Sequence, residues 1–147
     1  MVNVKILNKS KWELPKYETN GAAGLDLRAN IEDNIIIKPF ERVLVPTGIY
    51  TEIPIGYEAQ IRARSGLSIK HGITLVNAIG TIDSDYRGEW KIPLINLSNE
   101  VYTLVDGERI AQVVFSKYEK VEFITVSNEE ELEKSKRGDG GFGSTGK

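Results

Sequence analysis

The pattern of apolar and polar positions along the chain predicts a β protein, and it is clearest in YEAQIRAR, residues 57–64. Every second residue from Tyr57 to Ala63 is apolar, and the residues between them are polar or charged. Successive side chains of a strand point to opposite faces of a sheet, so this alternation predicts a half-buried strand. Its polar face ends at Arg64.

Short segments rich in Val, Ile, Thr and Tyr recur along the chain, separated by Gly, Pro, Asn and Asp, which is typical of an all-β domain. EWKIPLINLS (89–98) alternates less, which predicts burial on both faces, either in a sandwich core or at a subunit interface. Pro93 within it favours an edge strand or a bulge, because proline lacks a backbone N–H. The other predicted strands are VNVKIL (2–7), IIIK (35–38), RVLVPTGIYTEI (42–53), ITLVNAI (73–79), VYTLV (101–105), RIAQVVF (109–115) and VEFITV (121–126).

Only two segments are compatible with a helix. SGLSIKHG (65–72) predicts a short helix of about two turns. NEEELEKSK is rich in charge and is interpreted as a solvated linker. For a chain of 147 residues we expect one domain at 1–127, a charged linker at 128–136 and a flexible, glycine-rich C-terminal flap at 137–147.

The composition removes several kinds of site and partner. The chain has no cysteine and one histidine, His71, which excludes thiol nucleophiles and multi-histidine metal sites. A net charge of −2 with scattered Lys and Arg argues against a nucleic-acid-coating surface, and no apolar run is long enough for a membrane helix. We therefore expect a cytoplasmic protein that binds neither nucleic acid nor a membrane. A small phosphorylated ligand, which needs only a local cluster of donors, remains compatible.

Polar residues interrupt apolar segments at two early places in the chain. Asp26 lies within AAGLDLRA, where it is either a functional group or a strand-end carboxylate that accepts backbone hydrogen bonds. RARSGLS places Arg64, Ser65 and Gly66 at the start of the predicted helix. A guanidinium group, a hydroxyl and backbone amides can together hold a phosphate, although a helix cap by Ser65 is the alternative.

A third stretch, VNAIGTIDSDYRGEW, gathers Asn77, Gly80, Asp83, Asp85 and Tyr86. A turn between two apolar strands would explain the glycine and one aspartate, but not the amide, the second carboxylate and the tyrosine as well. An asparagine side chain presents a donor and an acceptor side by side, which suits the edge of a base. A positioned carboxylate such as Asp83 can orient and deprotonate a water.

Two further stretches lie towards the C-terminus. In GERIAQVVF, Arg109 precedes Gln112, which either makes a cross-strand hydrogen bond or binds phosphate oxygens. RGDGGFGSTGK (137–147) carries Arg137 and Phe142 among glycines and can bury little by itself. Glycine lets backbone amides approach anionic oxygens closely, so this composition predicts a flap that closes over a ligand.

Taken in this order, the five stretches resemble the five motifs of the trimeric dUTPase family. The matching segments are AGLDLRA (23–29), RSGLS (64–68), NAIGTIDSDYRG (77–88), GERIAQ (107–112) and RGDGGFGSTG (137–146). The resemblance implies an all-β, antiparallel jelly-roll-like barrel that assembles as a homotrimer with active sites at subunit interfaces. It also implies hydrolysis of dUTP to dUMP and pyrophosphate with Mg²⁺ as cofactor.

The resemblance also implies residue roles. Asp83 would be the base that activates the attacking water, and Tyr86 would lie under the deoxyribose. Asp26 would act only through waters on a triphosphate-bound Mg²⁺, or structurally. The implied substrate-binding residues are Arg64, Ser65, Gly66 and Gln112 for phosphates, Asn77 and Gly80 for the uracil, and Arg137, Phe142, Gly143, Ser144 and Thr145 in the flap.

Two other functions are compatible with the same resemblance. A dCTP deaminase shares the fold and much of the phosphate site, but it is expected to use a glutamate as its base, whereas IDSDY supplies Asp83. A non-catalytic trimeric nucleotide-binding module would be expected to lack the aspartate or the glycine-rich ending, and both are present.

Overall fold

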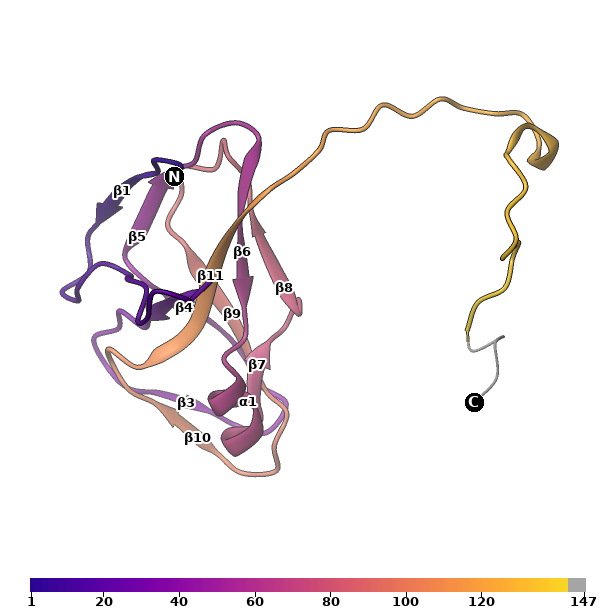
Figure 1. Ribbon diagram of the computed structural model, residues 1–147. Helices are drawn as coiled ribbons and strands as arrows, with labels where there is room; N and C mark the ends of the chain where they lie inside the picture. The colour runs from indigo at the N-terminus through magenta and orange to yellow at the C-terminus, as the bar shows by residue number, and fades with distance from the viewer. Residues whose placement is uncertain (143–147) are drawn as a thin grey trace.

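A computed structural model of the chain describes residues 1–142, and its fold is built almost entirely of strands (Figure 1). The predicted helix is present as α1, Ser65–His71, and the charged segment near the C-terminus contains only a single 3₁₀ turn, η1, Glu129–Glu131. The all-β class predicted from the sequence is therefore confirmed. The strands are Lys5–Asn8 (β1), Leu25–Arg28 (β2), Ile35–Ile37 (β3), Arg42–Pro46 (β4), Ile49–Glu52 (β5), Tyr57–Arg62 (β6), Ile73–Leu75 (β7), Ile79–Ile82 (β8), Lys91–Asn96 (β9), Tyr102–Leu104 (β10) and Arg109–Lys117 (β11).

The strands form four antiparallel sheets around one interior (Figure 1). Their orders are β2-β11-β6-β8, β4-β9-β7, β1-β5 and β10-β3. In residues 1–142 these ladders enclose the core without joining into one continuous closed barrel. Most neighbours in a sheet are distant in sequence, so the fold brings the separate motifs of the chain together.

One hydrophobic core receives side chains from all four sheets. Trp90, Leu27 and Leu94 are among its largest fully buried members. The alternation predicted for β6 is confirmed, since Ala59 and Ile61 are buried whereas the Arg62 side chain is exposed. The hydrophobic effect on this alternating face fixes the register of β6, because a slip of one residue would turn every apolar side chain outward.

The single long strand predicted over residues 42–53 is wrong, because a turn divides it into β4 and β5. Thr47 is buried in this turn and its hydroxyl donates to the Trp90 carbonyl at 2.6 Å. Gly48 has φ +70°, and a Cβ there would lie 2.6 Å from the Ser10 backbone nitrogen. The turn thus depends on a residue that tolerates the left-handed region and has no side chain.

The edge or bulge position predicted for Pro93 is also wrong. Strand β9 lies between β4 and β7, and its register against β4 is continuous through Leu44 and Pro93. The Pro93 carbonyl accepts from the Val76 backbone N–H at 3.0 Å, just after β7 ends at Leu75. Since N–H and C=O of one strand residue point to the same side, the missing donor of proline faces a place where the neighbouring strand has stopped.

Strand β9 has one buried face and one partly exposed face. Ile92, Leu94 and Asn96 are buried, whereas Pro93 and Ile95 are partly exposed. The predicted burial on both faces is thus not found within one chain. The alternative, that the outer face meets another subunit, stays a prediction.

The chain leaves this body after β11 and continues as an extended arm, residues 119–142, that runs away from the sheets (Figure 1). Tyr118 makes the connection at its base, where its N–H donates to the Gly56 carbonyl at 3.2 Å. The strand predicted for VEFITV (121–126) is wrong, since this segment has no ladder, and Phe123 and Ile124 are 87% and 90% exposed. A strand pattern forms a strand only where another strand can pair with its backbone groups.

None of the helices in residues 1–142 combines the length and the apolar character that crossing a membrane requires.

Candidate active site

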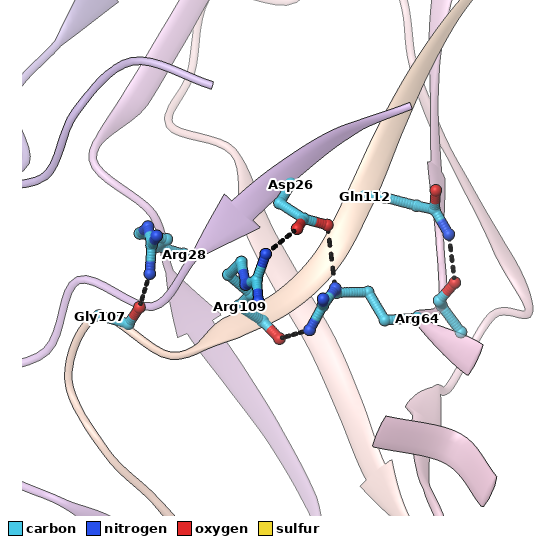
Figure 2. A network of polar contacts seen from close by, with 7 residues as sticks. Asp26, Arg28, Arg64, Gly107, Arg109 and Gln112 are labelled. Carbon is cyan, nitrogen blue, oxygen red and sulfur yellow. Dashed lines mark hydrogen bonds and ion pairs between the residues drawn. The ribbon is translucent and has the colours of Figure 1, made fainter. Parts of the chain in front are cut away.

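A charged polar cluster of the body is centred on Asp26 of β2 (Figure 2). One carboxylate oxygen accepts from Arg64 Nε at 2.9 Å, and the other accepts from Arg109 Nη1 at 3.0 Å. Arg64 Nη1 also donates to the Arg109 carbonyl at 3.0 Å. We call these three residues the Asp26 cluster. One carboxylate against two guanidinium groups leaves it with a net positive charge.

Strand pairing places the members of the Asp26 cluster side by side. Gln112 of β11 pairs with Asp26 of β2 on one side and with Arg62 of β6 on the other. A register shift between Arg109 and Ala111 marks a bulge at the start of β11. Bulges re-aim side chains, and here Arg109 points towards Asp26.

Gln112 lies beside the Asp26 cluster, and a hydrogen bond orients its side-chain amide. Its Nε2 donates to the Ala63 carbonyl at 3.0 Å (Figure 2). A Cβ on Gly24 would come within 2.5 Å of its Oε1, so a larger residue there would have to displace this amide. The cross-strand hydrogen bond considered for Gln112 from the sequence is therefore made to a backbone carbonyl.

Ser65 and Gly66 begin α1, immediately after Arg64. Both are exposed, and the extended N-cap residue Arg64 makes no side-chain hydrogen bond that caps the helix. The first backbone N–H groups of a helix have no partner within it. The start of α1 thus presents open donors next to the Arg64 guanidinium.

A second group of candidate residues surrounds β8. Asn77 lies in the turn before this strand, where its carbonyl accepts from the Ile79 N–H at 2.6 Å and the next residue, Ala78, has φ +60°. Gly80 is buried against Ile61 of β6, and a Cβ there would lie 3.4 Å from Asn77 Nδ2. The small residue lets the asparagine side chain lie close to the strand.

Asp83 and Tyr86 follow the other end of β8. Asp83 is exposed, and its carbonyl accepts from the Tyr86 N–H at 3.1 Å, which closes a turn. The Tyr86 hydroxyl donates to the Glu89 carbonyl at 3.0 Å, and its ring lies against Gly88, where a Cβ would collide with it. The ring is therefore held in place while 45% of the residue stays exposed.

The Asp26 cluster and Asp83 do not meet within one chain. Asp83 follows Ile82, which pairs with Ala59 of β6, whereas Arg64 lies five residues beyond Ala59 along the same path. Asp83 lies one position further in the opposite direction, so six positions at about 3.3 Å each separate it from Arg64, which is roughly 20 Å along the sheet. The structure brings Asp26, Arg64 and Gln112 together and leaves Asp83 and Tyr86 at a separate place.

The motifs that shape these two places match one protein family along nearly the whole chain. The dUTPase family model matches residues 10–146, which include the Asp26 cluster, β8 and the arm. The chain belongs to the dUTPase family.

Named relatives agree with this dUTPase assignment. The deoxyuridine 5'-triphosphate nucleotidohydrolase of Finegoldia magna is 62% identical over 99% of this chain and 99% of its own. The protein of the same name from Fusobacterium nucleatum is 57% identical over 99% of this chain and 98% of its own.

Solved dUTPase structures have the same fold. A mutant dUTPase of Staphylococcus bacteriophage 80alpha with dUpNHpp has a TM-score of 0.82 at 25% identity, and 98% of each chain is covered. A mutant dUTPase of phage phi11 of S. aureus, whose structure reveals the coordination of a structural Mg(II) ion, has a TM-score of 0.76 at 21% identity over 87% of this chain and 99% of that one.

The arm of this dUTPase carries the remaining predicted residues. Arg137 Nε donates to the Gly140 carbonyl at 2.7 Å, and the Phe142 ring is fully exposed. Gly143, Ser144 and Thr145 lie outside the described residues. The sequence prediction leaves Arg109 out of the site, although its place in GERIAQ, just before Gln112, is the signal that would have included it.

Residues 1–142 contain no group of three or more His, Asp or Glu side chains placed to hold a metal ion. Asp26 is the acidic residue closest to the candidate phosphate donors, and both of its oxygens contact arginines. The donor set of the body therefore suits an anion better than a bare cation.

Proposed function

We propose that this dUTPase hydrolyses dUTP to dUMP and pyrophosphate by attack of water on the α-phosphorus. The observation that carries the proposal is the family match over residues 10–146, which covers all five motifs. In a cytoplasmic enzyme, this reaction would limit uracil incorporation into DNA and supply dUMP for thymidylate synthesis.

The phosphates would bind at the start of α1. Arg64 has N–H donors beyond those it uses in the Asp26 cluster, and the exposed residues Ser65 and Gly66 beside it would add a hydroxyl and two backbone amides. Gln112 would add one donor from β11. Charge-assisted hydrogen bonds of this kind are about twice as strong as neutral ones.

The nucleoside would bind along β8 and its following turn. Asn77 and the backbone near Gly80 would pair with the uracil edge, in a pocket too tight for the methyl group of thymine. The Tyr86 ring, which is held by Glu89 and Gly88, would lie under the deoxyribose and exclude a ribose 2'-hydroxyl. Asp83, exposed at the end of the strand, would accept a proton from the attacking water.

Magnesium would be held chiefly by the triphosphate and by waters, because the described residues offer no acidic cage for it. When bound, it would neutralise phosphate charge. The residues of this chain would then orient the phosphates through Arg64, Ser65, Gly66 and Gln112.

We further propose a homotrimer in which each site is shared between subunits. A base and the donors that hold the phosphates must lie within a few ångströms of the same triphosphate, yet Asp83 and Arg64 of one chain are roughly 20 Å apart along the sheet. Asp83 of one subunit would therefore work with the Asp26 cluster of another. The arm leaves its own body and would carry Arg137 and Phe142, with Gly143, Ser144 and Thr145, to a neighbouring site.

Pyrophosphate release with Mg²⁺, measured for dUTP, dTTP, dCTP and UTP, tests the reaction and its specificity. We expect rapid release from dUTP and at most a small fraction of that rate from the other three. Ammonia released from dCTP would instead support the deaminase. Tight nucleotide binding without any product would support the non-catalytic module.

Replacing Asp83 with asparagine tests the proposed base. The amide is nearly isosteric but cannot take a proton, so we expect kcat to fall by about 10²–10⁴-fold while dUpNHpp affinity changes little. Asp85→Asn, two residues further along the same turn, is the matched control and should keep nearly the full rate. A variant Asp83→Asn with more than half the wild-type rate, with chemistry limiting, would remove Asp83 from this role.

Subunit mixing tests the shared site. A chain with Asp83→Asn and a chain lacking residues 137–147 should each be inactive alone. After subunit exchange, a trimer can combine an intact Asp83 with an intact flap from different chains, so activity should return in part. Proven exchange without any recovery would show that each chain completes its own site.

A further inference from the structure

The Asp26 cluster contains more charge than phosphate binding alone would require, because a carboxylate lies between the two arginines. Both oxygens of Asp26 are engaged, at 2.9 Å with Arg64 and at 3.0 Å with Arg109. The side chain is 21% exposed, and that of Arg64 is 26% exposed. A carboxylate beside an anion site weakens the electrostatic attraction of that site for phosphate, so its presence calls for a function of its own.

We propose that Asp26 is a positioning residue, which orients Arg64 and Arg109 so that both guanidinium groups bind the triphosphate chain. The inference rests on the proposed function and deepens it. It assigns Arg109 to substrate binding, and it makes the structural alternative for Asp26 specific.

Geometry supports this positioning role. Arg64 is held at two points, Asp26 and the Arg109 carbonyl, so its planar fork has a fixed direction (Figure 2). Each guanidinium group has more N–H donors than these contacts use, and the remaining donors are available to an anion. The two arginines use two of the roughly four lone-pair positions of the Asp26 carboxylate, one on each oxygen.

The fold also shows why the second arginine needs the carboxylate. Arg109 begins β11 at the bulge, and 42% of its side chain is exposed. Two guanidinium groups close together repel each other and would separate into solvent without an anion between them. Asp26 thus keeps both arginines at one place before the substrate arrives, and such preorganisation lowers the entropy cost of binding.

Asp26→Asn separates orientation from charge. Removing a negative charge should strengthen phosphate binding if charge alone matters. In contrast, the amide would place its NH₂ group against one of the arginines and release that side chain, so the positioning role predicts weaker binding. These two expectations have opposite signs.

The molecule offers a matched control at Asp106. Its side chain is also 21% exposed, and it likewise binds a cation, Lys11, at 2.7 Å, but it ties the N-terminal segment to the body through Trp12. Asp106→Asn therefore reproduces the loss of a half-buried, paired carboxylate without touching Arg64 or Arg109.

The test is calorimetric binding of dUpNHpp and of dUMP to the full-length protein, each in Mg²⁺ and in EDTA. For Asp26→Asn we expect the affinity for dUpNHpp to fall about 10- to 100-fold, as expected for a lost charge-assisted contact. The loss should be the same in Mg²⁺ and in EDTA. The dUMP affinity should fall less than about threefold, and Asp106→Asn should change neither by more than that. Arg109→Gln should weaken the binding of dUpNHpp about tenfold. Because the two residues act together, the affinity loss of the double variant should be smaller than the product of the two single losses.

Several outcomes would overturn the inference. A loss of dUpNHpp affinity confined to the Mg²⁺ buffer would show that Asp26 acts through a metal-bound water. Unchanged or tighter binding by Asp26→Asn would show that its charge matters and its positioning of the arginines does not. Equal losses for dUMP and dUpNHpp, or a matching loss in Asp106→Asn, would indicate general disruption. If Asp26→Asn does not fold, a normal dUpNHpp affinity of Arg109→Gln overturns it instead. Wild-type protein that neither binds dUpNHpp nor hydrolyses dUTP would count against the proposed function itself.

Discussion

The Asp26 cluster and the arm are both assigned to the same triphosphate, but they are built in opposite ways. The cluster lies on strands β2 and β11 and on the segment after β6, and each of its charges has a partner within the chain. The arm contacts the body at its base only, and its apolar side chains, such as Phe123, are exposed. The folding free energy of one chain therefore pre-forms the first region, whereas we expect ligand or neighbouring subunits to order the second.

Deleting residues 137–147 should have the largest effect on this comparison. Because the deletion removes Arg137 and the proposed stacking ring, we expect kcat/KM for dUTP to fall by about 10³-fold or more, the usual worth of an arginine that stabilises phosphoryl charge. The thermal midpoint of the ligand-free protein should hardly change, since residues 121–139 are exposed. Calorimetry checks the thermal midpoint, and steady-state kinetics on the same preparation check kcat/KM.

Tryptic cleavage after Lys136 and Arg137 gives a second measure of the same contrast. Both residues are exposed in the ligand-free chain, so cleavage should be fast, and dUpNHpp with Mg²⁺ should slow it markedly. Unchanged cleavage, or a truncated enzyme with near-normal turnover, would mean that the arm has no part in the site.

Leu94→Ala should destabilise the body and leave the arm unaffected. Leu94 is 1% exposed on the inner face of β9, and truncating such a residue usually costs about 2–5 kcal/mol of unfolding free energy. The control Leu132→Ala lies in the arm at 59% exposure and should change stability by less than about 0.5 kcal/mol. Denaturant titrations of the two variants measure the difference. Similar losses would show that the arm is as firmly packed as the core.

Phe142→Ala should have an intermediate effect on binding and none on folding. A base stacked on an aromatic ring is worth about 1–3 kcal/mol, so we expect KM for dUTP to rise roughly tenfold with a smaller change in kcat. Phe142→Trp should restore most of the affinity, because it keeps a flat ring. An alanine variant with unchanged KM would show that the ring does not meet the base.

The smallest effect concerns the link between the N-terminal segment and the body. Burial raises the pKa of Asp106, but hydrogen bonds from Lys11, the Ile31 N–H and Trp12 outweigh it and hold this pKa below its ordinary value of 3.8. The ionised form therefore stabilises the fold fully above about pH 4, and this contribution is lost as the pH falls through the lower, folded-state pKa. Asp106→Asn should remove it, within about 1 kcal/mol. Unfolding curves at pH 7 and pH 3 check this, and equal differences at both would refute it.

Much of the body could be predicted because its strands alternate and its breaks are marked. Strand β6 and helix α1 are examples, since local pattern and turn residues agree there. VEFITV could not be placed from pattern alone, because an extended apolar segment becomes a strand only when another backbone pairs with it. The edge or bulge position predicted for Pro93 was wrong for a related reason, since its missing N–H donor is harmless where β7 has already ended.

The candidate site was predictable as a list of motifs but not as an arrangement. Spacing along the chain does not reveal that the carboxylate of Asp26 would engage Arg64 and Arg109, which lie 38 and 83 positions away. Nor does it reveal that Asp83 and Arg64 lie at opposite ends of a ladder. Both facts depend on strand order and register, which long-range pairing decides.

The places of the two tryptophans have a spectroscopic consequence. Trp90 is buried against Phe115, and Trp12 packs where a Cβ on Gly107 would stand, so both indoles belong to the body. Native emission therefore reports on the environment of the core and is nearly blind to the arm. The variant Phe142→Trp would add a reporter at the far end of the chain, and quenching of that indole on nucleotide addition would give a stopped-flow signal for closure separate from chemistry.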